Sequence, residues 1–184
     1  RPLIADPHWA NKVKNGKENL IKRCVCCLYC FESMMKGAYK YTHGHCSVNP
    51  FVGREDVKLK QDGNGRKVVI IGAGCAGLTA AELLSKRGFN VTVLEKESKQ
   101  GGQLNLASKP PHKDKMNWVC ADLLANAVNN GAKVIFDTLA TKDIIASYSP
   151  EIVINATAGN AIHPRAFQGD NVCTVTEILN GTVK

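Results

Sequence analysis

The sequence predicts an α/β fold with a doubly wound parallel sheet, preceded by a loop-rich segment that carries cysteines. Three observations support this prediction. Near-continuous apolar runs alternate with helical periods from residue 67 onward, and a glycine-rich turn joins the first run to the first helical period. Most of the eight cysteines lie between positions 24 and 46. We therefore divide the chain into residues 1–23, 24–65 and 66–184.

Composition places the chain among globular proteins. Its 184 residues are 44% hydrophobic, and the net charge of +8 is spread along the whole length instead of forming a block. Nucleic-acid binding is not expected, because no basic stretch is interleaved with aromatic residues. No apolar run is long enough to span a bilayer, and no secretory leader opens the chain. We predict a cytoplasmic protein without membrane or nucleic-acid partners.

The first two zones are expected to contain little regular structure. Residues 9–21 could form a short helix that is interrupted near Gly16. Residues 24–65 show little periodicity and end in a turn or hinge at residues 61–65.

Strands and helices alternate in the third zone. Because the apolar runs are nearly continuous, we expect strands that are buried on both faces and therefore parallel. Gly88 and Gly131 should end the two helices between them. The predicted strands are residues 67–71, 91–94, 134–136 and 152–155, and the predicted helices are residues 78–87 and 115–129.

A glycine-rich turn links the first predicted strand to the first predicted helix. Residues 72–77 read GAGCAG, which matches G-x-G-x-x-G, and Glu95 closes the next strand. Gly72 permits the tight turn, Gly74 lets a pyrophosphate approach the backbone, and Gly77 lets the helix pack closely on the sheet. Glu95 can accept hydrogen bonds from ribose hydroxyls and disfavours NADP. The context predicts a Rossmann-like dinucleotide site, with a ligand-free glycine turn as the alternative; the motif alone does not decide between FAD and NAD.

The clustered cysteines indicate metal ligation. Cys24, Cys27 and Cys30 are evenly spaced, and Cys46 follows at a distance, with Pro50 close behind it. Disulfides are disfavoured in a chain without a secretion signal. Three close thiolates and one distant thiolate suit a [4Fe–4S] cluster, for which these four cysteines are the candidate ligands.

Other interpretations of the cysteines stay open. Zinc could be held by the four thiolates, or by three of them with His43 or His45, and the thiols could also be unligated. We interpret Cys26 as a spare thiol or packing residue that points away from Cys27. Cys75 has no evident resolving partner in the sequence, so a redox disulfide is not expected there.

Residues 67–95 resemble the FAD-binding start of the flavoproteins that have two dinucleotide domains. The QGGQL stretch at residues 100–104 resembles the turn that follows the ribose acid in those proteins. The ATAG stretch at residues 156–159 resembles their segment beside the flavin nucleotide, with one alanine inserted. These resemblances favour FAD over NAD. They imply cofactor-binding roles for Gly72, Gly74, Cys75, Ala76, Gly77, Glu95, Lys96, Gly102, Gln103, Leu104, Ala140, Ala156, Thr157 and Gly159.

The upstream sequence resembles a more specific family. Residues 1–7 are similar to the exit of an old-yellow-enzyme-type barrel. The cysteine segment, with CSVNP at residues 46–50 and GRE at residues 53–55, is similar to the linker of the NADH:flavin oxidoreductases that include 2,4-dienoyl-CoA reductase, enoate reductase and trimethylamine dehydrogenase. The LxLAxxPP pattern at residues 104–111 fits the same family, and the order of these matches is the family's order.

The resemblance implies that the chain is an internal part of a longer redox enzyme. Residues 1–23 would end an upstream FMN barrel, residues 24–65 would be the [4Fe–4S] linker, and residues 66–184 would be an incomplete FAD domain. FMN and NAD(P)H would bind to the upstream barrel and to a downstream domain, outside this chain. NAD(P)H would reduce FAD, and the cluster would relay electrons to FMN for reduction of an activated C=C bond.

No catalytic residue is assigned within this segment, which is expected to be inactive alone. Phe31, Met34 and Met35 are expected to pack around the cluster and exclude water from it. Two other functions remain: a zinc- and nucleotide-binding module without activity, and the electron-input subunit of a glutamate-synthase-like enzyme, which usually carries more cysteines. Homo-oligomer formation is left open.

Overall fold

A four-stranded parallel sheet organises the second half of the chain. The computed structural model describes residues 2–38, 42–159, 169 and 172–183. The strand order is β3-β2-β1-β4, and β1 pairs with both β2 and β4. All four predicted strands are present, to within a residue at each end. Their bounds are β1 Lys67–Ile71, β2 Asn90–Leu94, β3 Lys133–Ile135 and β4 Ile152–Asn155.

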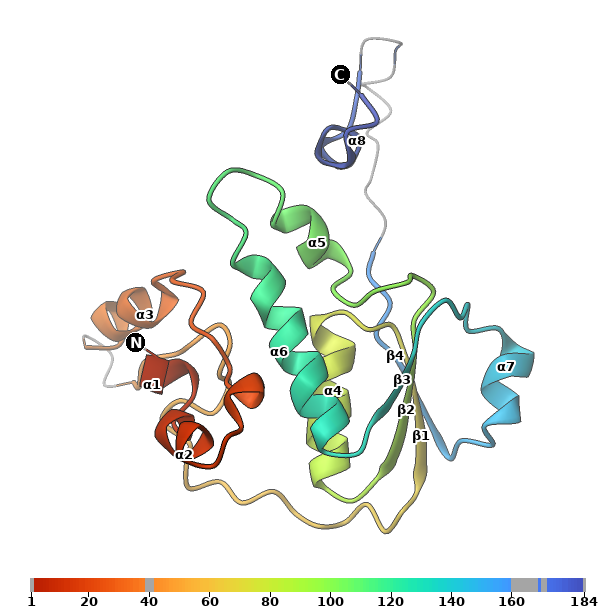
Figure 1. The fold of residues 1–184 in the computed structure, drawn as a ribbon, viewed down its shortest axis with the longest axis horizontal. Coiled ribbons are helices and arrows are strands. Elements are labelled where there is room, and N and C mark those ends of the chain that lie inside the picture. The colour runs from red at the N-terminus through yellow and green to blue at the C-terminus, as the bar shows by residue number, and fades with distance from the viewer. Residues whose placement is uncertain (1, 39–41, 160–168, 170–171, 184) are drawn as a thin grey trace.

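Helices cover both faces of this sheet, which confirms the doubly wound fold. Helices α4 (Cys75–Lys86) and α6 (Met116–Asn129) lie side by side on one face, and α7 (Lys142–Ser147) lies on the other (Figure 1). The chain moves outward from β1 through β2 to β3 and then returns to place β4 on the free side of β1. This reversal leaves a crevice position at the carboxyl ends of β1 and β4, where such folds bind ligands.

The hydrophobic core lies between the sheet and the pair α4 and α6. Alternate β1 and β2 residues contact one face of each helix, and these side chains are almost completely excluded from solvent. Burial of this kind supplies the main favourable term in folding. The buried core residues are Val68, Ile70, Ala73, Leu78, Ala81, Phe89, Val91, Val93, Cys120, Leu123, Ala127 and Ala132.

The helices differ from the predicted ranges mainly at their starts. Helix α4 begins at Cys75, because Gly74 is its extended N-cap and the glycine turn leads straight into the helix. Gly88 and Gly131 follow the ends of α4 and α6 with positive φ angles, as predicted. Three further short helices, α5 (Gln103–Ala107), α7 and α8 (Val175–Asn180), were not predicted.

The first two zones contain more helix than the sequence indicates. Helices α1 (Pro2–Ala5) and α2 (Trp9–Lys14) precede a 3-10 turn, η1 (Glu18–Leu20), and the chain is interrupted at Gly16 as expected. Helix α3 (Tyr29–Ala38) contradicts the prediction that the cysteine zone lacks regular structure. Among the described residues, none of these helices has the length and apolar character needed to cross a membrane.

Residues just before the cysteine segment are fixed to α4 and α6 by polar contacts with buried side chains of these two helices. The Nη2 and Nε atoms of Arg23 both donate to Oδ1 of Asp122 in α6, at 2.6 Å and 2.9 Å, and its backbone N–H donates to Oδ2 of that carboxylate at 2.8 Å. Lys22 pairs with Glu82 of α4 at 2.8 Å. The side-chain amide of Asn126 donates to the carbonyl of Leu20 at 3.0 Å. We call this set of contacts, made by residues 20–23, the interdomain clamp.

The clamp has a pH dependence that can be measured. Burial alone would raise the pKa of Glu82, but attraction and hydrogen bonding from Lys22, with a further hydrogen bond from Lys86, lower it overall. A depressed native pKa contributes stability above the unfolded pKa of about 4.3, and this is lost as pH falls through the native value. Glu82→Gln should therefore lower the unfolding free energy by about 2 kcal/mol at neutral pH and flatten its decline in acid.

Urea denaturation of this chain, from about pH 7 down to about pH 3, measures both effects. Glu32→Gln is the matched control, because Glu32 forms an exposed ion pair with Lys36 in α3 and should leave the denaturation midpoint nearly unchanged. Equal midpoints for Glu82→Gln and the parent chain at neutral pH would show that the clamp contributes no stability.

Candidate functional site

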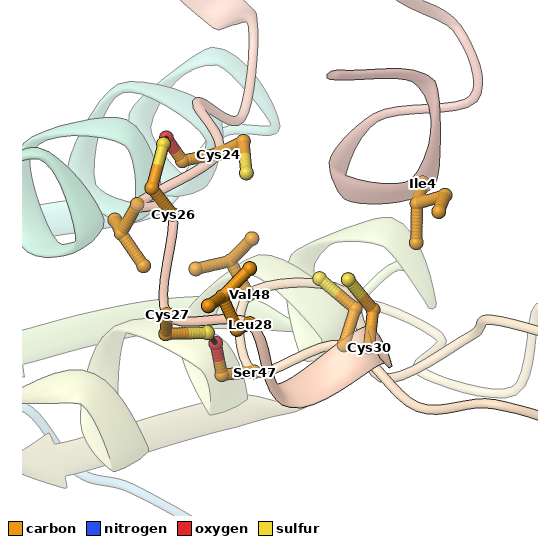
Figure 2. A pocket seen from close by; sticks show the side chains of 10 residues that line it. Ile4, Cys24, Cys26, Cys27, Leu28, Cys30, Ser47 and Val48 are labelled. Carbon is orange, nitrogen blue, oxygen red and sulfur yellow. Dashed lines mark hydrogen bonds between the residues drawn. The ribbon is translucent and has the colours of Figure 1, made fainter. Parts of the chain in front are cut away.

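The four candidate metal ligands surround one hollow. Cys24, Cys27, Cys30 and Cys46 all line it (Figure 2), although Cys30 is the second residue of α3 and the rest of that helix lies between it and Cys46. The remaining lining residues are Ile4, Val25, Cys26, Leu28, Ser47 and Val48. The structure thus assembles the predicted thiol set from two separate segments.

The backbone of the first segment is held in an unusual conformation. Cys26 and Leu28 have φ angles of 57° and 60°, which L-residues with side chains adopt at a cost of about 1 kcal/mol each. Such strained residues persist only where the surroundings determine them, and they are concentrated at ligand clamps and other functional sites. These two left-handed residues change the direction of the chain between Cys24 and Cys30.

Ser33 brings the second segment to the first. Its buried hydroxyl donates to the carbonyl of Cys30 at 3.1 Å and accepts the backbone N–H of His45 at 2.7 Å. Asn49 then joins the segment to α1 by donating to the carbonyl of Ile4 at 2.8 Å. Sequence reasoning gave Ser33 no role, because nothing in its local pattern marks a serine that bridges two loops.

The sulfurs in this hollow point in different directions. The thiol of Cys27 faces the hydroxyl of Ser47 at 2.9 Å (Figure 2). The thiol of Cys26 is directed back to the carbonyl of Cys24, and the ammonium group of Lys115 approaches it at 3.7 Å. Within the part of the chain that the structure describes, no three histidine, cysteine or acidic side chains converge closely enough to hold a single metal ion.

The two candidate zinc histidines lie elsewhere. His43 and His45 pack edge to face, with ring centroids 4.8 Å apart, and neither lines the hollow. The apolar residues of α3 also depart from expectation. Phe31, Met34 and Met35 are 60%, 46% and 52% exposed, so they do not cover the cysteine hollow and instead leave an apolar surface on α3.

The glycine turn at the carboxyl end of β1 has the geometry that its motif indicates. A Cβ on Gly72, whose φ is +105°, would lie 2.9 Å from the carbonyl oxygen of Ala156. A Cβ on Gly77 would lie 1.9 Å from the carbonyl oxygen of Gly72. A Cβ on Gly74 would meet nothing within 4 Å. Packing therefore requires two of the glycines, whereas the third leaves open space over the turn.

Open space at this point lies against the start of α4. Cys75 and Ala76 form its first turn, where backbone N–H groups lack partners within the helix and the helix dipole favours an anion. A pyrophosphate is the ligand that this combination commonly binds.

Glu95 fixes the same turn from the end of β2. Its buried carboxylate accepts the backbone N–H of Ala73 at 2.6 Å and that of Glu97 at 3.0 Å. Each carboxylate oxygen has a second lone pair, so Glu95 retains acceptor capacity for a ribose hydroxyl. Lys96 follows it on the surface, 3.5 Å from the Glu97 carboxylate.

Two other predicted segments meet beside this turn. The backbone N–H of Gly101 donates to the carbonyl of Ala73, and the following Gly102 has a φ of +52°. Gln103 donates to the carbonyl of Gly159 at 3.0 Å, and Thr157 donates its backbone N–H and its hydroxyl to the Oδ1 atom of Asn155, at 3.1 Å and 2.7 Å. Leu104 packs against the core, Ala156 contacts Gly72, and Ala140 lies in the loop after β3.

The fold agrees with comparison to known proteins. A family profile described as an NAD(P)-binding Rossmann-like domain matches residues 70–139. The NADH oxidase of Thermoanaerobacter brockii is 39% identical over 168 residues, which is 90% of this chain and 25% of that protein. The cinnamate reductase of Clostridium sporogenes is 30% identical over 97% of this chain and 27% of that protein.

A solved structure shows that the similarity extends beyond the glycine turn at residues 72–77, which we call the nucleotide turn from here on. The complex of 2-naphthoyl-CoA reductase with 2-naphthoyl-CoA superposes with a TM-score of 0.87 at 31% identity, and the match covers 100% of this chain and 28% of that one. Residues of the cysteine segment are therefore included in the match. The chain spans about a quarter of the length of these relatives.

Proposed function

The chain belongs to the flavin/iron–sulfur oxidoreductase family, and on this premise we propose that it is the electron-transfer portion of an NAD(P)H-dependent enzyme. In the proposed enzyme, electrons pass from NAD(P)H through FAD and a [4Fe–4S] cluster to FMN, which reduces an activated C=C bond. The cinnamate and naphthoyl-CoA reductases among its relatives support this choice of substrate class.

One observation carries the proposal. The interdomain clamp connects the cysteine segment to α4, which begins at the nucleotide turn, and to α6, which packs against α4. Arg23 is adjacent to Cys24, and its partner Asp122 lies on α6 beside α4. The Arg23 guanidinium also stacks over Trp118 at 4.9 Å, which fixes its orientation further. Two redox sites that are connected by these contacts suit electron transfer between them.

The donor set fits an iron–sulfur cluster. Five thiols, that of Cys26 included, and neither histidine line the hollow, and thiolates are the usual cluster ligands. The four candidate ligands surround a space. A mononuclear zinc site would require them to converge on one point, which they do not do in the described structure. Cys24, Cys27, Cys30 and Cys46 would hold the cluster, and Cys26 would stay outside it with Lys115. When bound, the cluster would supply one-electron chemistry.

The nucleotide turn would hold FAD. Gly74 leaves room for the pyrophosphate, the N–H groups of Cys75 and Ala76 face it, and Glu95 accepts ribose hydroxyls. The segment around Thr157 would lie beside the nucleotide. The residues of this chain bind and orient the cofactor, whereas substrate and NAD(P)H would occupy other parts of the protein.

The apolar surface on α3 supports the proposed division of the chain. Phe31, Met34 and Met35 are exposed on a helix that directly follows the cysteine loop. Exposed apolar surface of this kind marks an interface. We propose that the upstream FMN barrel, whose last part would be residues 1–23, covers it in the longer protein.

The proposed location of the protein is the cytoplasm, because a reducing compartment keeps cysteine thiols free to bind a cluster.

The test is cofactor analysis of the full-length protein purified without oxygen. Iron, acid-labile sulfide, FAD and FMN should all be present, and NADH or NADPH should bleach both the flavin and the cluster absorbance. A colourless protein with zinc and no sulfide would instead support the zinc- and nucleotide-binding module. More iron than one cluster accounts for would favour the glutamate-synthase-like alternative.

A further inference from the structure

Cys75 has a partner that the sequence did not reveal. Its sulfur lies 3.6 Å from the sulfur of Cys120, which is 45 positions away in the chain. The two residues belong to the first turn of α4 and the middle of α6, and these helices pack side by side on the sheet. The expectation that Cys75 lacks a resolving partner is therefore wrong, because packing of the two helices brings the thiols together.

The two thiols differ in their chemistry. A hydrogen bond from Cys120 lowers the pKa of Cys75 to about 7, although burial acts in the opposite direction. Donation of that hydrogen bond, together with burial, raises the pKa of Cys120. The helix N-terminus also favours a thiolate at Cys75. Near neutral pH, Cys75 is thus the nucleophile and Cys120 keeps its proton.

Access to the pair is one-sided. Cys75 lines a cavity of about 190 Å³ between the cysteine segment and the helices α4 and α6, whereas Cys120 is 3% exposed. The charged residues that line this cavity form the ion pairs of the interdomain clamp. A small oxidant can therefore reach the Cys75 sulfur first.

We propose that Cys75 and Cys120 form a redox-active dithiol, which a hydroperoxide converts into a disulfide. The Cys75 thiolate attacks the terminal oxygen of the hydroperoxide, an S–O bond forms and the O–O bond breaks. The other oxygen leaves with a proton from solvent, as water when the oxidant is hydrogen peroxide and as the alcohol when it is an organic hydroperoxide. The Cys120 sulfur then attacks the Cys75 sulfur, so that the S–S bond forms and the S–O bond breaks. The hydroxyl leaves as water with the Cys120 proton.

The disulfide would change the nucleotide turn. Because an S–S bond is about 2.05 Å long, the two sulfurs must approach by about 1.5 Å. Cys75 sits in the helix turn whose backbone faces the pyrophosphate, and the Cys120 thiol also contacts the carbonyl of Gly101 at 3.8 Å. Oxidation should therefore weaken FAD binding. This consequence rests on the proposed function, whereas the dithiol chemistry does not.

The experiment treats full-length protein with hydrogen peroxide, alkylates the remaining thiols and maps the peptides by mass spectrometry. We expect a crosslinked pair containing Cys75 and Cys120, with at least a tenfold loss of Cys75 alkylation that dithiothreitol reverses (order of magnitude). Cys173→Ser, which changes an exposed cysteine elsewhere, should leave this result unchanged. Full alkylation of Cys75 and Cys120 after peroxide would overturn the proposal, whether or not FAD is bound.

Two variants of Cys120 separate its roles. Cys120→Ser keeps a hydrogen-bond donor, so alkylation of Cys75 should retain a midpoint near pH 7, but no crosslink can form and dimedone should trap a sulfenic acid at Cys75. Cys120→Ala removes the donor, so the alkylation midpoint should rise towards the ordinary thiol value of about 8.5. Identical Cys75 profiles in the parent protein and both variants would show that the pair does not interact.

Discussion

Cys46→Ala should remove the iron–sulfur cluster from the full-length protein, whereas Cys26→Ala should leave it in place. Both cysteines border the same hollow, but the Cys26 thiol is directed to the carbonyl of Cys24 and towards Lys115. Cys46 is the only candidate ligand from the second segment, so its loss leaves one corner of the cluster without a protein thiolate. We expect iron content to fall roughly tenfold in Cys46→Ala and to change little in Cys26→Ala.

Iron and sulfide assays after oxygen-free purification measure this difference, with flavin content as an internal reference. Flavin should persist in Cys46→Ala, because no residue of the glycine turn lines the cysteine hollow, and α6 lies between the helices α1 to α3 and the sheet that carries the turn (Figure 1). Equal iron loss in the two variants would show that the ligand set is wrong and that Cys26 takes part. Retention of full iron in Cys46→Ala would place the cluster elsewhere in the protein.

The sheet and its glycine turn could be predicted from the sequence because both are encoded locally. Continuous apolar runs define β1 and β4 to the residue, and the spacing of Gly72, Gly74 and Gly77 follows from contacts within the turn itself. The assignment of a doubly wound sheet needed only the order of these local signals.

Features that depend on contacts distant in sequence could not be predicted in this way. Glu82 and Asp122 look like ordinary helix-surface acids, and only the partners from residues 22 and 23 explain why both are buried. Helix α3 was missed although Phe31, Met34 and Met35 recur at helical spacing, because the period is short and overlaps the cysteine pattern that indicates a loop. The contact between Cys75 and Cys120 was hidden because it joins positions 45 residues apart, on two helices whose packing the sequence pattern does not specify.

The role of the turn as a dinucleotide site can be tested by two alanine substitutions with opposite outcomes. In Gly77→Ala, the new Cβ would lie 1.9 Å from the backbone carbonyl of Gly72, and neither the helix nor the strand can move away without disrupting the core. We expect a loss of about 3 kcal/mol or more in unfolding free energy, measured by urea denaturation. Failure of this variant to fold would agree with that expectation.

Gly74→Ala should leave the fold intact and impair the cofactor. Gly74 has a φ of −80°, which alanine adopts readily, and its Cβ would meet no protein atom within 4 Å. The added methyl group instead occupies the space through which a pyrophosphate would approach the backbone N–H groups of α4. Loss of the preferred N-cap residue should cost no more than about 1 kcal/mol.

The affinity of the full-length apoprotein for FAD should fall by about tenfold to a hundredfold in Gly74→Ala, as measured by titration of flavin fluorescence. A parent-like denaturation midpoint combined with this loss would identify the turn as the site of the pyrophosphate, because a structural defect would lower both quantities together. Unchanged FAD affinity in a well-folded Gly74→Ala protein would mean that the nucleotide does not approach this turn. Glu95 would then serve only to hold Ala73 and Glu97 in place.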